Sequence, residues 1–325
     1  MFAAAKIRFL SLVVLLVSLA SPALSFDGFD WQSVFLKESR KARALRMINS
    51  SYSPKITFRK LSERSNEGCT VGRYQINGLD PVDKKDRAVH VLSYVGKKQM
   101  RKEQAVVIVP SIVGVSPLET WYADLFCGKW LRALIIENIE RDEPVGLSLK
   151  DYDRAALRKL AAIRHSVEFL YADGSRQVGV MGTSQGAIAA SLALGIERKI
   201  KAGALIAGGG NLPEIIVDST QDLLKALREE RMKAFGFRSR DEYLRALRAN
   251  IVINNLDFAG HTGFKPVFVS IAEDDTKVPT PTQWALARAF RAQHIVRYRG
   301  NHIPVILKTY LVSSGAIYEF FRSNL

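Results

Sequence analysis

One pentapeptide, Gly182–Gly186 with the sequence G-T-S-Q-G, constrains the fold of this chain more than any other feature. An apolar run, 178–181, precedes it, and a helix-like stretch of small residues, 187–194, follows it. A G-x-S-x-G sequence in this setting predicts a strand, a sharp turn with Ser184 at its apex, and a helix. Small neighbours are needed because the backbone of such a turn is strained. The pattern therefore predicts a serine hydroxyl exposed above a sheet.

Two further candidates follow in the chain order Ser, Asp, His. Residues 266–272 are typical of a buried strand and lead into a polar loop that contains Asp275. Residues 294–298 predict the next strand, which is followed by His302. Because loops at the carboxyl edge of a parallel sheet bring distant residues together, both side chains are expected near Ser184. An imidazole that takes the serine proton, oriented by a carboxylate, would make this serine a nucleophile.

From about Arg87 to the C-terminus the chain resembles the α/β-hydrolase superfamily, in particular its esterase and dienelactone-hydrolase-like branch. The resemblance rests on the G-x-S-x-G turn, the D-x-x-V-P spacing of Asp275–Pro279, and the G-x-H pattern of Gly300–His302. It implies an α/β fold: a mostly parallel central sheet flanked by helices, with a small helical cap insertion. It also implies a catalytic triad of Ser184, Asp275 and His302, and no cofactor.

The chain departs from the family after the predicted strand 105–109. The family often has His-Gly there, whereas this chain has Pro110–Gly114, which keeps only the final glycine of H-G-x-x-G. The resemblance assigns an oxyanion hole to two backbone N–H groups. One belongs to Gln185, the residue after the nucleophile, and the other to Ile112.

The carboxylate of the triad has two candidates, since Asp274 and Asp275 are adjacent. In an extended loop two consecutive side chains cannot point the same way. Asp275 has the D-x-x-V-P spacing to Val278 and Pro279, so it is the predicted partner of His302. Asp274 remains the alternative.

The N-terminus has the pattern of a secretory signal peptide over residues 1–25. Lys6 and Arg8 precede an apolar run at 9–20, and Ala23-Leu24-Ser25 fits a small-x-small cleavage site. The pattern predicts a secreted or periplasmic protein that begins at Phe26. An uncleaved membrane anchor is the alternative, although the apolar run is short for a membrane span.

The rest of the chain is long enough for one large α/β domain with an insertion. We expect an N-terminal extension over 26–70 and the main domain over 71–325, whose first two strands, near 71–76 and 88–95, run antiparallel. Within it, 211–262 predicts a helical insertion, because Ser219–Asp222 and Ser239–Glu242 both fit capping boxes. The insertion is either a cap over the catalytic loops or structural decoration.

Cysteine content and charge leave some alternatives open. Cys69 and Cys127 are the only cysteines, and they form either one disulfide or two buried thiols. The net charge of +15 favours either electrostatic contact with an anionic envelope or simply a solvated basic surface. The basic residues are scattered and are not interleaved with aromatics, which argues against a nucleic-acid partner.

Other kinds of site find little support. No histidine or cysteine pair has zinc-ligand spacing, and Gly208–Gly210 lacks the Lys-Ser/Thr of a phosphate-binding loop. The leading hypothesis is an exported serine hydrolase that cleaves a small-molecule carboxylic ester without a cofactor or metal. A serine peptidase of the same fold and a non-catalytic binding protein of that fold are the alternatives.

Overall fold

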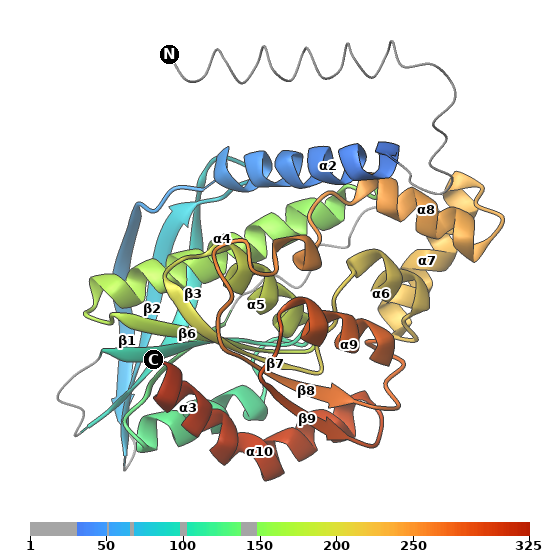
Figure 1. Cartoon of the computed structure of the whole chain (residues 1–325). Coiled ribbons are helices and arrows are strands. Elements are labelled where there is room, and N and C mark those ends of the chain that lie inside the picture. Colours follow the sequence, from blue (N-terminus) through green and yellow to red (C-terminus); the bar gives the residue numbers. More distant parts are fainter. Residues whose placement is uncertain (1–30, 51, 66–67, 98–102, 138–147) are drawn as a thin grey trace. The chain divides into compact units, whose positions relative to one another are not determined.

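The computed structural model describes residues 31–50, 52–65, 68–97, 103–137 and 148–325, and for 31–39 only the backbone (Figure 1). The predicted signal peptide, residues 1–25, lies outside the described residues. Lys41–Leu325 form one compact unit, which contains all strands of the described residues.

The centre of this unit is a nine-stranded sheet with the order β1-β2-β3-β5-β4-β6-β7-β8-β9. The pairs from β1 to β5 are antiparallel, and all pairs from β5 to β9 are parallel. The strands are β1 (Ile56–Ser65), β2 (Cys69–Leu79), β3 (Asp86–Gly96), β4 (Gln104–Val109), β5 (Arg132–Ile136), β6 (Gln177–Thr183), β7 (Ile200–Ile206), β8 (Val267–Ala272) and β9 (His294–Tyr298).

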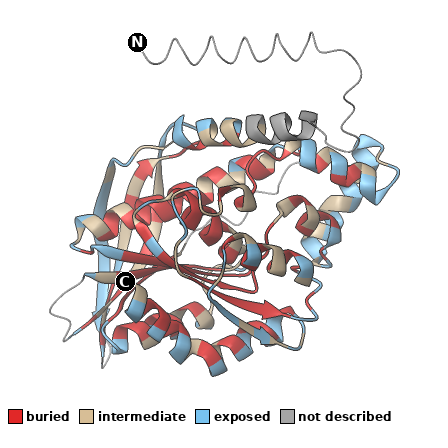
Figure 2. Cartoon of the chain, in the orientation of Figure 1, coloured by how far each residue is buried: buried red, intermediate tan, exposed pale blue. Residues whose placement is uncertain are grey.

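Helices cover both faces of the sheet (Figure 1). One face packs against α4, α5 and α9, and the other against α3 and α10. Strands β4, β5 and β8 are therefore almost entirely buried, which explains their continuous runs of Val, Ile, Leu and Ala (Figure 2). The helices outside the insertion are α2 (Trp31–Ser50), α3 (Pro117–Gly128), α4 (Asp151–Ala172), α5 (Gln185–Ile196), α9 (Thr280–Ala289) and α10 (His302–Asn324).

The predicted insertion, 211–262, is helical, and its apolar side chains form a small cluster with Leu149 and Tyr152 at the start of α4. Two predicted helices are present, and the structure adds a short helix and a 3-10 turn. The Ser239 cap is confirmed, because its side chain accepts a hydrogen bond from the Glu242 N–H. The Ser219 capping box is wrong: α7 begins after Gln221, and its N-terminus has no side-chain cap. The elements are α6 (Leu212–Asp218), α7 (Asp222–Phe235), α8 (Arg240–Asn250) and η1 (Asn255–Phe258).

The sheet begins earlier than the predicted domain boundary at residue 71. The two strands predicted near 71–76 and 88–95 are present as β2 and β3, and they are antiparallel as expected. The additional strand β1 lies in the segment that the sequence pattern left in an N-terminal extension, and it pairs with β2. Nine of its ten residues are exposed, so it lacks the alternation of apolar and polar residues by which a strand is recognised.

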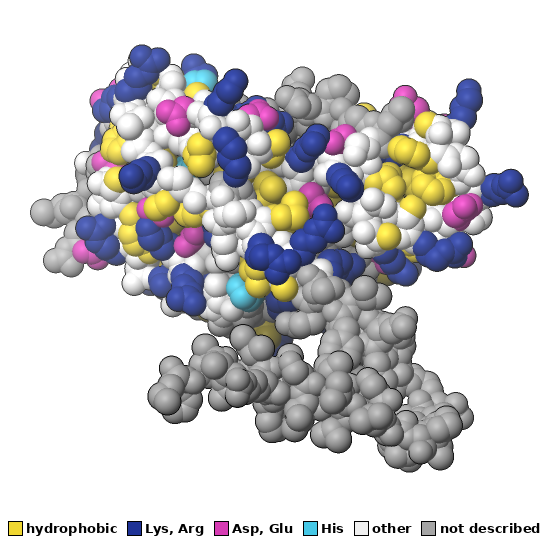
Figure 3. Space-filling model, turned by 90° about the horizontal axis from the view of Figure 1, so that it is seen from above, with side chains coloured by type: hydrophobic (Ala, Val, Ile, Leu, Met, Phe, Trp, Pro, Cys, Tyr) yellow, Lys and Arg dark blue, Asp and Glu magenta, His cyan; other side chains and the backbone are white. Residues whose placement is uncertain are grey.

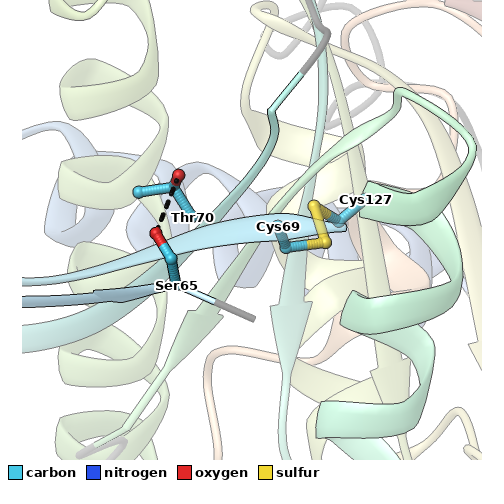
Figure 4. The surroundings of a disulfide bond; sticks show 4 residues. All are labelled: Ser65, Cys69, Thr70 and Cys127. Atoms are coloured by element: carbon cyan, nitrogen blue, oxygen red, sulfur yellow. Dashed lines mark hydrogen bonds between the residues drawn. A yellow bond between two sulfur atoms is a disulfide. The ribbon is translucent and has the colours of Figure 1, made fainter. Parts of the chain in front are cut away.

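Cys69 and Cys127 form a disulfide, which decides between the two alternatives left open by the sequence (Figure 4). It joins β2 to the C-terminal turn of α3, and both cysteines are buried. Beside it, the Ser65 and Thr70 hydroxyls lie 3.5 Å apart across the β1–β2 pair. The disulfide therefore ties the antiparallel side of the sheet to a helix on the face of the sheet that α10 shares.

Basic side chains are dispersed on the surface seen from above in Figure 3. On that face Lys and Arg lie among acidic and apolar side chains and do not form a continuous stripe.

Within the described ranges, none of the helices has the combination of length and apolar character that a membrane span requires.

Replacing both cysteines by serine is expected to lower the free energy of unfolding by roughly 2–4 kcal/mol, because the bridge closes a long chain loop in the unfolded state. The two residues are 58 positions apart. Urea unfolding of the Cys69→Ser/Cys127→Ser variant beside the oxidised wild type measures the difference. Equal unfolding midpoints would contradict the structural role of the bridge.

Candidate active site

Ser184 lies at the turn between β6 and α5, as the pentapeptide predicts. Its backbone has a positive φ of 56° with ψ −121°, a conformation that costs a non-glycine residue energy. Its N–H donates to the Ile206 carbonyl oxygen on β7 at 2.8 Å. This geometry turns the side chain away from the regular direction of either element, and the serine is only 9% exposed.

The glycines on either side of Ser184 are required by close packing of the backbone. A Cβ atom on Gly186 would collide with the carbonyl oxygens of Val109 and Pro110 at the end of β4. A Cβ atom on Gly182 would collide with the backbone of Gly186. The turn therefore depends on direct contact between α5 and the neighbouring strand end, which only glycine permits.

His302 and Asp275 lie beside Ser184 in a continuous chain of hydrogen bonds. The His302 Nε2 atom is 2.8 Å from the Ser184 Oγ atom, and its Nδ1 atom is 2.6 Å from the Asp275 Oδ2 atom. His302 and Asp275 are buried, so these bonds are shielded from water. The structure thus brings together the three residues that the sequence predicts, from β6–α5, from the loop after β8 and from the start of α10.

The Asp275 carboxylate is held by several donors besides His302. Its Oδ1 atom accepts from the N–H groups of Lys277 and Val278 at 2.8 and 3.0 Å. Its Oδ2 atom also accepts from the Gln283 side-chain amide at 2.8 Å. Hydrogen bonds of this number to one carboxylate fix its orientation toward the imidazole.

Gln283 is a positioning residue that the sequence analysis missed. It lies on α9 and is fully buried, and its amide oxygen accepts from the Ala272 N–H at 3.0 Å. Its amide nitrogen donates to both Asp275 and the Val278 carbonyl oxygen. Nothing in a single sequence distinguishes this glutamine from any other helical glutamine, since its role depends on the path of the preceding loop.

Asp274, the alternative carboxylate, has a different partner. Its Oδ2 atom accepts from the Gly300 N–H at 2.9 Å, and its own N–H donates to the Gly300 carbonyl oxygen at 3.2 Å. Asp274 therefore joins the loop after β8 to the loop that carries His302, and Asp275 contacts the imidazole. Asn301 completes the second loop, because its side chain accepts from the His302 N–H at the start of α10.

The two residues assigned to an oxyanion hole also lie at Ser184. Gln185 is the first residue of α5, and Ile112 lies in the loop after β4, beside a short bridge between Ser111 and Gly114. Both residues line a cavity together with Ser184. The loop 110–114 therefore contributes Ile112 to the wall of the cavity at Ser184.

Two cavities meet at Ser184. The first has a volume of about 120 Å³ and lies under the insertion, where it is lined mainly by apolar side chains of α4, α5, α6 and α7. The second has a volume of about 410 Å³ and lies between α3 and the start of α10. They share five residues, namely Ile112, Ser184, Gln221, Lys277 and Val278. The insertion therefore supplies a wall of the site.

The other four histidines of the chain line neither cavity. His165 is buried in α4, where burial lowers its pKa, and its ring stacks on Tyr52. A Cβ atom at Gly78 would collide with this ring, so His165 fills a packing position. Among the described residues, no group of three or more His, Cys, Asp or Glu side chains is arranged to hold a metal ion.

The chain is similar to known proteins in its structure. No protein-family model matches the chain, and no curated protein matches its sequence. The solved structure of an acetyl xylan esterase from Paenibacillus sp. R4 is similar, with a TM-score of 0.64 and 13% identity, over 94% of this chain and 97% of that one.

Two other solved structures resemble the chain. Est1E from Butyrivibrio proteoclasticus has a TM-score of 0.54 and 17% identity over 79% of this chain and 99% of its own. An acylaminoacyl peptidase from Pyrococcus horikoshii has a TM-score of 0.55 and 14% identity over 82% of this chain and 49% of its own. The chain has the α/β-hydrolase fold.

In this α/β-hydrolase fold, Asp275→Asn is expected to lower turnover by about ten-thousand-fold, because the imidazole loses the partner that holds its tautomer. Asp274→Asn is expected to cost far less, since an amide oxygen still accepts from Gly300. Steady-state kinetics of both variants, with circular dichroism to establish folding, tests this pair. Near-normal turnover in Asp275→Asn with a severe loss in Asp274→Asn would reverse the assignment.

Proposed function

We propose that this protein is an exported serine hydrolase that cleaves a carboxylic ester through an acyl-enzyme on Ser184. The observation that carries the proposal is the hydrogen-bonded chain Ser184–His302–Asp275, which ends at the meeting point of two cavities. Such a chain activates a serine hydroxyl, and two cavities accommodate the two halves of an ester.

The reaction proceeds in two halves. His302 takes the hydroxyl proton as the Ser184 Oγ atom bonds to the carbonyl carbon, and the backbone N–H groups of Gln185 and Ile112 donate to the oxyanion. The tetrahedral intermediate collapses, the alcohol leaves with the proton from His302, and the acyl group stays on Ser184. Water, deprotonated by His302, then attacks the acyl-enzyme. The bond between the acyl carbon and the Ser184 Oγ atom breaks, His302 returns the proton to Oγ, and the acid leaves.

The apolar lining of the cavities supports an ester with apolar substituents. The first cavity takes the acyl chain, and its walls include Ile188 and Leu192 of α5 and Leu227 of α7. The second cavity takes the alcohol, and its rim includes the exposed side chains of Trp121 and Ile303. Apolar surface of this kind around a catalytic group favours binding of apolar ligands.

A serine peptidase is the nearest alternative, because the same triad cleaves amides. The similar peptidase structure corresponds to this chain over only half its length, whereas the two similar esterases correspond over nearly all of theirs. Hydrolysis rates measured with p-nitrophenyl acyl esters and with aminoacyl p-nitroanilides distinguish the two activities. A fluorophosphonate probe labels the nucleophilic serine of either enzyme and does not label a non-catalytic binding protein.

Ser184→Ala is expected to abolish covalent labelling by a fluorophosphonate and to lower ester hydrolysis by on the order of a million-fold, as loss of a triad nucleophile does. The fold should persist, because alanine removes only the hydroxyl. Gel-based labelling and p-nitrophenyl ester assays measure both effects. Labelling that persists in the variant would exclude Ser184 as the nucleophile.

Ala189→Leu is expected to reduce kcat/KM for p-nitrophenyl hexanoate about tenfold relative to the acetate ester. Ala189 lines the first cavity, so a larger side chain occupies space for the acyl chain. Ala226→Leu is the matched control, because Ala226 is exposed on α7 and lines neither cavity. An unchanged ratio in a folded Ala189→Leu variant would contradict the assignment of this cavity to the acyl chain.

Export is proposed from the pattern of residues 1–25 and is supported by the Cys69–Cys127 disulfide, since disulfides persist in oxidising compartments. We expect the exported protein to begin at Phe26. N-terminal sequencing of the periplasmic or secreted fraction tests this. An intact Met1 in that fraction would favour the uncleaved anchor.

A further inference from the structure

Two polar side chains besides Ser184 lie where the cavities meet. Gln221 and Lys277 line both cavities, and they come from different parts of the chain. Gln221 precedes α7 in the insertion, and Lys277 belongs to the loop of Asp275. Neither side chain takes part in the proposed reaction. Their position beside the reacting serine is suited to substrate binding.

The two loops that carry these side chains are hydrogen-bonded to each other. Thr220 donates its N–H to the Thr276 carbonyl oxygen at 2.9 Å, and the two threonine hydroxyls lie 2.8 Å apart. Ser219, which is 1% exposed, donates its hydroxyl to the Lys277 carbonyl oxygen at 2.6 Å. The same hydroxyl accepts from the Gln221 N–H at 3.1 Å.

These bonds fix the backbone at both side chains. On the other side, the Lys277 N–H donates to the Asp275 carboxylate, which itself contacts His302. The distance between the Lys277 backbone and the reacting atoms is therefore set by a rigid network. Both side chains therefore start from backbone positions that are fixed beside the reacting serine.

The electrostatic surroundings of Lys277 favour an anion. Its side chain is exposed, and within the described part of the chain no carboxylate lies within salt-bridge distance of its ammonium group. Glu119 is the one acidic residue among those that line either cavity, and its carboxylate accepts from the N–H and hydroxyl of Ser116. The place where the two cavities meet thus presents the positive charge of Lys277 in a mainly apolar lining.

We propose that Lys277 and Gln221 form a subsite for a carboxylate that the substrate bears close to its scissile ester. This inference rests on the proposed ester hydrolysis and names its substrate class, an ester of an otherwise apolar acid and alcohol with one negative charge. One ammonium and one neutral amide donor match the single charge and two oxygens of a carboxylate. Because both side chains line both cavities, the charge can lie on either half of the ester.

The experiment compares anionic and uncharged esters of matched shape. On the acyl side, p-nitrophenyl hydrogen succinate is compared with its methyl ester. On the alcohol side, p-nitrophenyl butyrate with a carboxylate on the ring is compared with the unsubstituted ester. Lys277→Met is expected to lower the anionic-to-uncharged ratio of kcat/KM about tenfold in at least one pair, mainly through KM, as loss of a charge-assisted hydrogen bond does.

Two further variants and one control variant complete the test. Lys277→Arg keeps the charge and should retain most of the ratio, and Gln221→Leu should lower it by a smaller factor. Lys225→Met is the matched control, because it removes the same charge from an exposed site on α7 that lines neither cavity. A ratio that is the same in wild type and Lys277→Met for both pairs overturns the proposal. An equal fall in Lys225→Met also overturns it, because the effect then belongs to the overall charge.

Failure of the proposed hydrolysis is distinguishable from failure of the subsite. Turnover of uncharged esters, lost in Ser184→Ala, tests the hydrolysis alone. If no ester is cleaved, calorimetry on Ser184→Ala with phenylbutyrate and phenylbutyramide tests the subsite by binding. Weaker binding of the carboxylate by about tenfold when Lys277→Met is added supports it. No binding, or equal loss for both ligands, overturns it.

Discussion

The positive φ of Ser184 is the constraint on which the rest of the site depends. A non-glycine residue in this conformation costs roughly 1–3 kcal/mol, and it persists only where the surroundings hold it. Here the surroundings are the contact of α5 with the end of β4 at Gly186 and the hydrogen bond from Ser184 to β7. The orientation of the hydroxyl toward His302 is therefore a product of packing between main-chain atoms.

The loop of Asp275 connects this chemistry to the shape of the site. Its carboxylate binds the imidazole and the Gln283 amide, while its backbone is bonded to the segment that enters α7. The insertion and the hydrogen-bonded chain Ser184–His302–Asp275 thus share one hydrogen-bonded frame. Three successive hydrogen bonds connect the Ser219 hydroxyl to His302, by way of the Lys277 backbone and the Asp275 carboxylate.

Local patterns were sufficient for the central residues of the site. Ser184 and Asp275 each follow a buried strand, and His302 follows the more exposed strand β9. A short motif identifies each loop, so the parallel sheet and its edge could be predicted. Long-range contacts were not accessible in this way. Ser219 fits a capping box, yet its hydroxyl bonds to Lys277 across 58 residues. Gln283 likewise acquires its role only from the fold.

The strand β1, which sequence patterns missed, forms one edge of the sheet. Its exposed residues include Arg59, Lys60, Glu63 and Arg64, and its register shifts between Lys60 and Ser62. An edge strand with free backbone groups is a template on which another chain can add a strand, and charged side chains and irregular register oppose this. The polarity that made β1 unrecognisable as a strand is therefore what keeps separate molecules from joining edge to edge into aggregates.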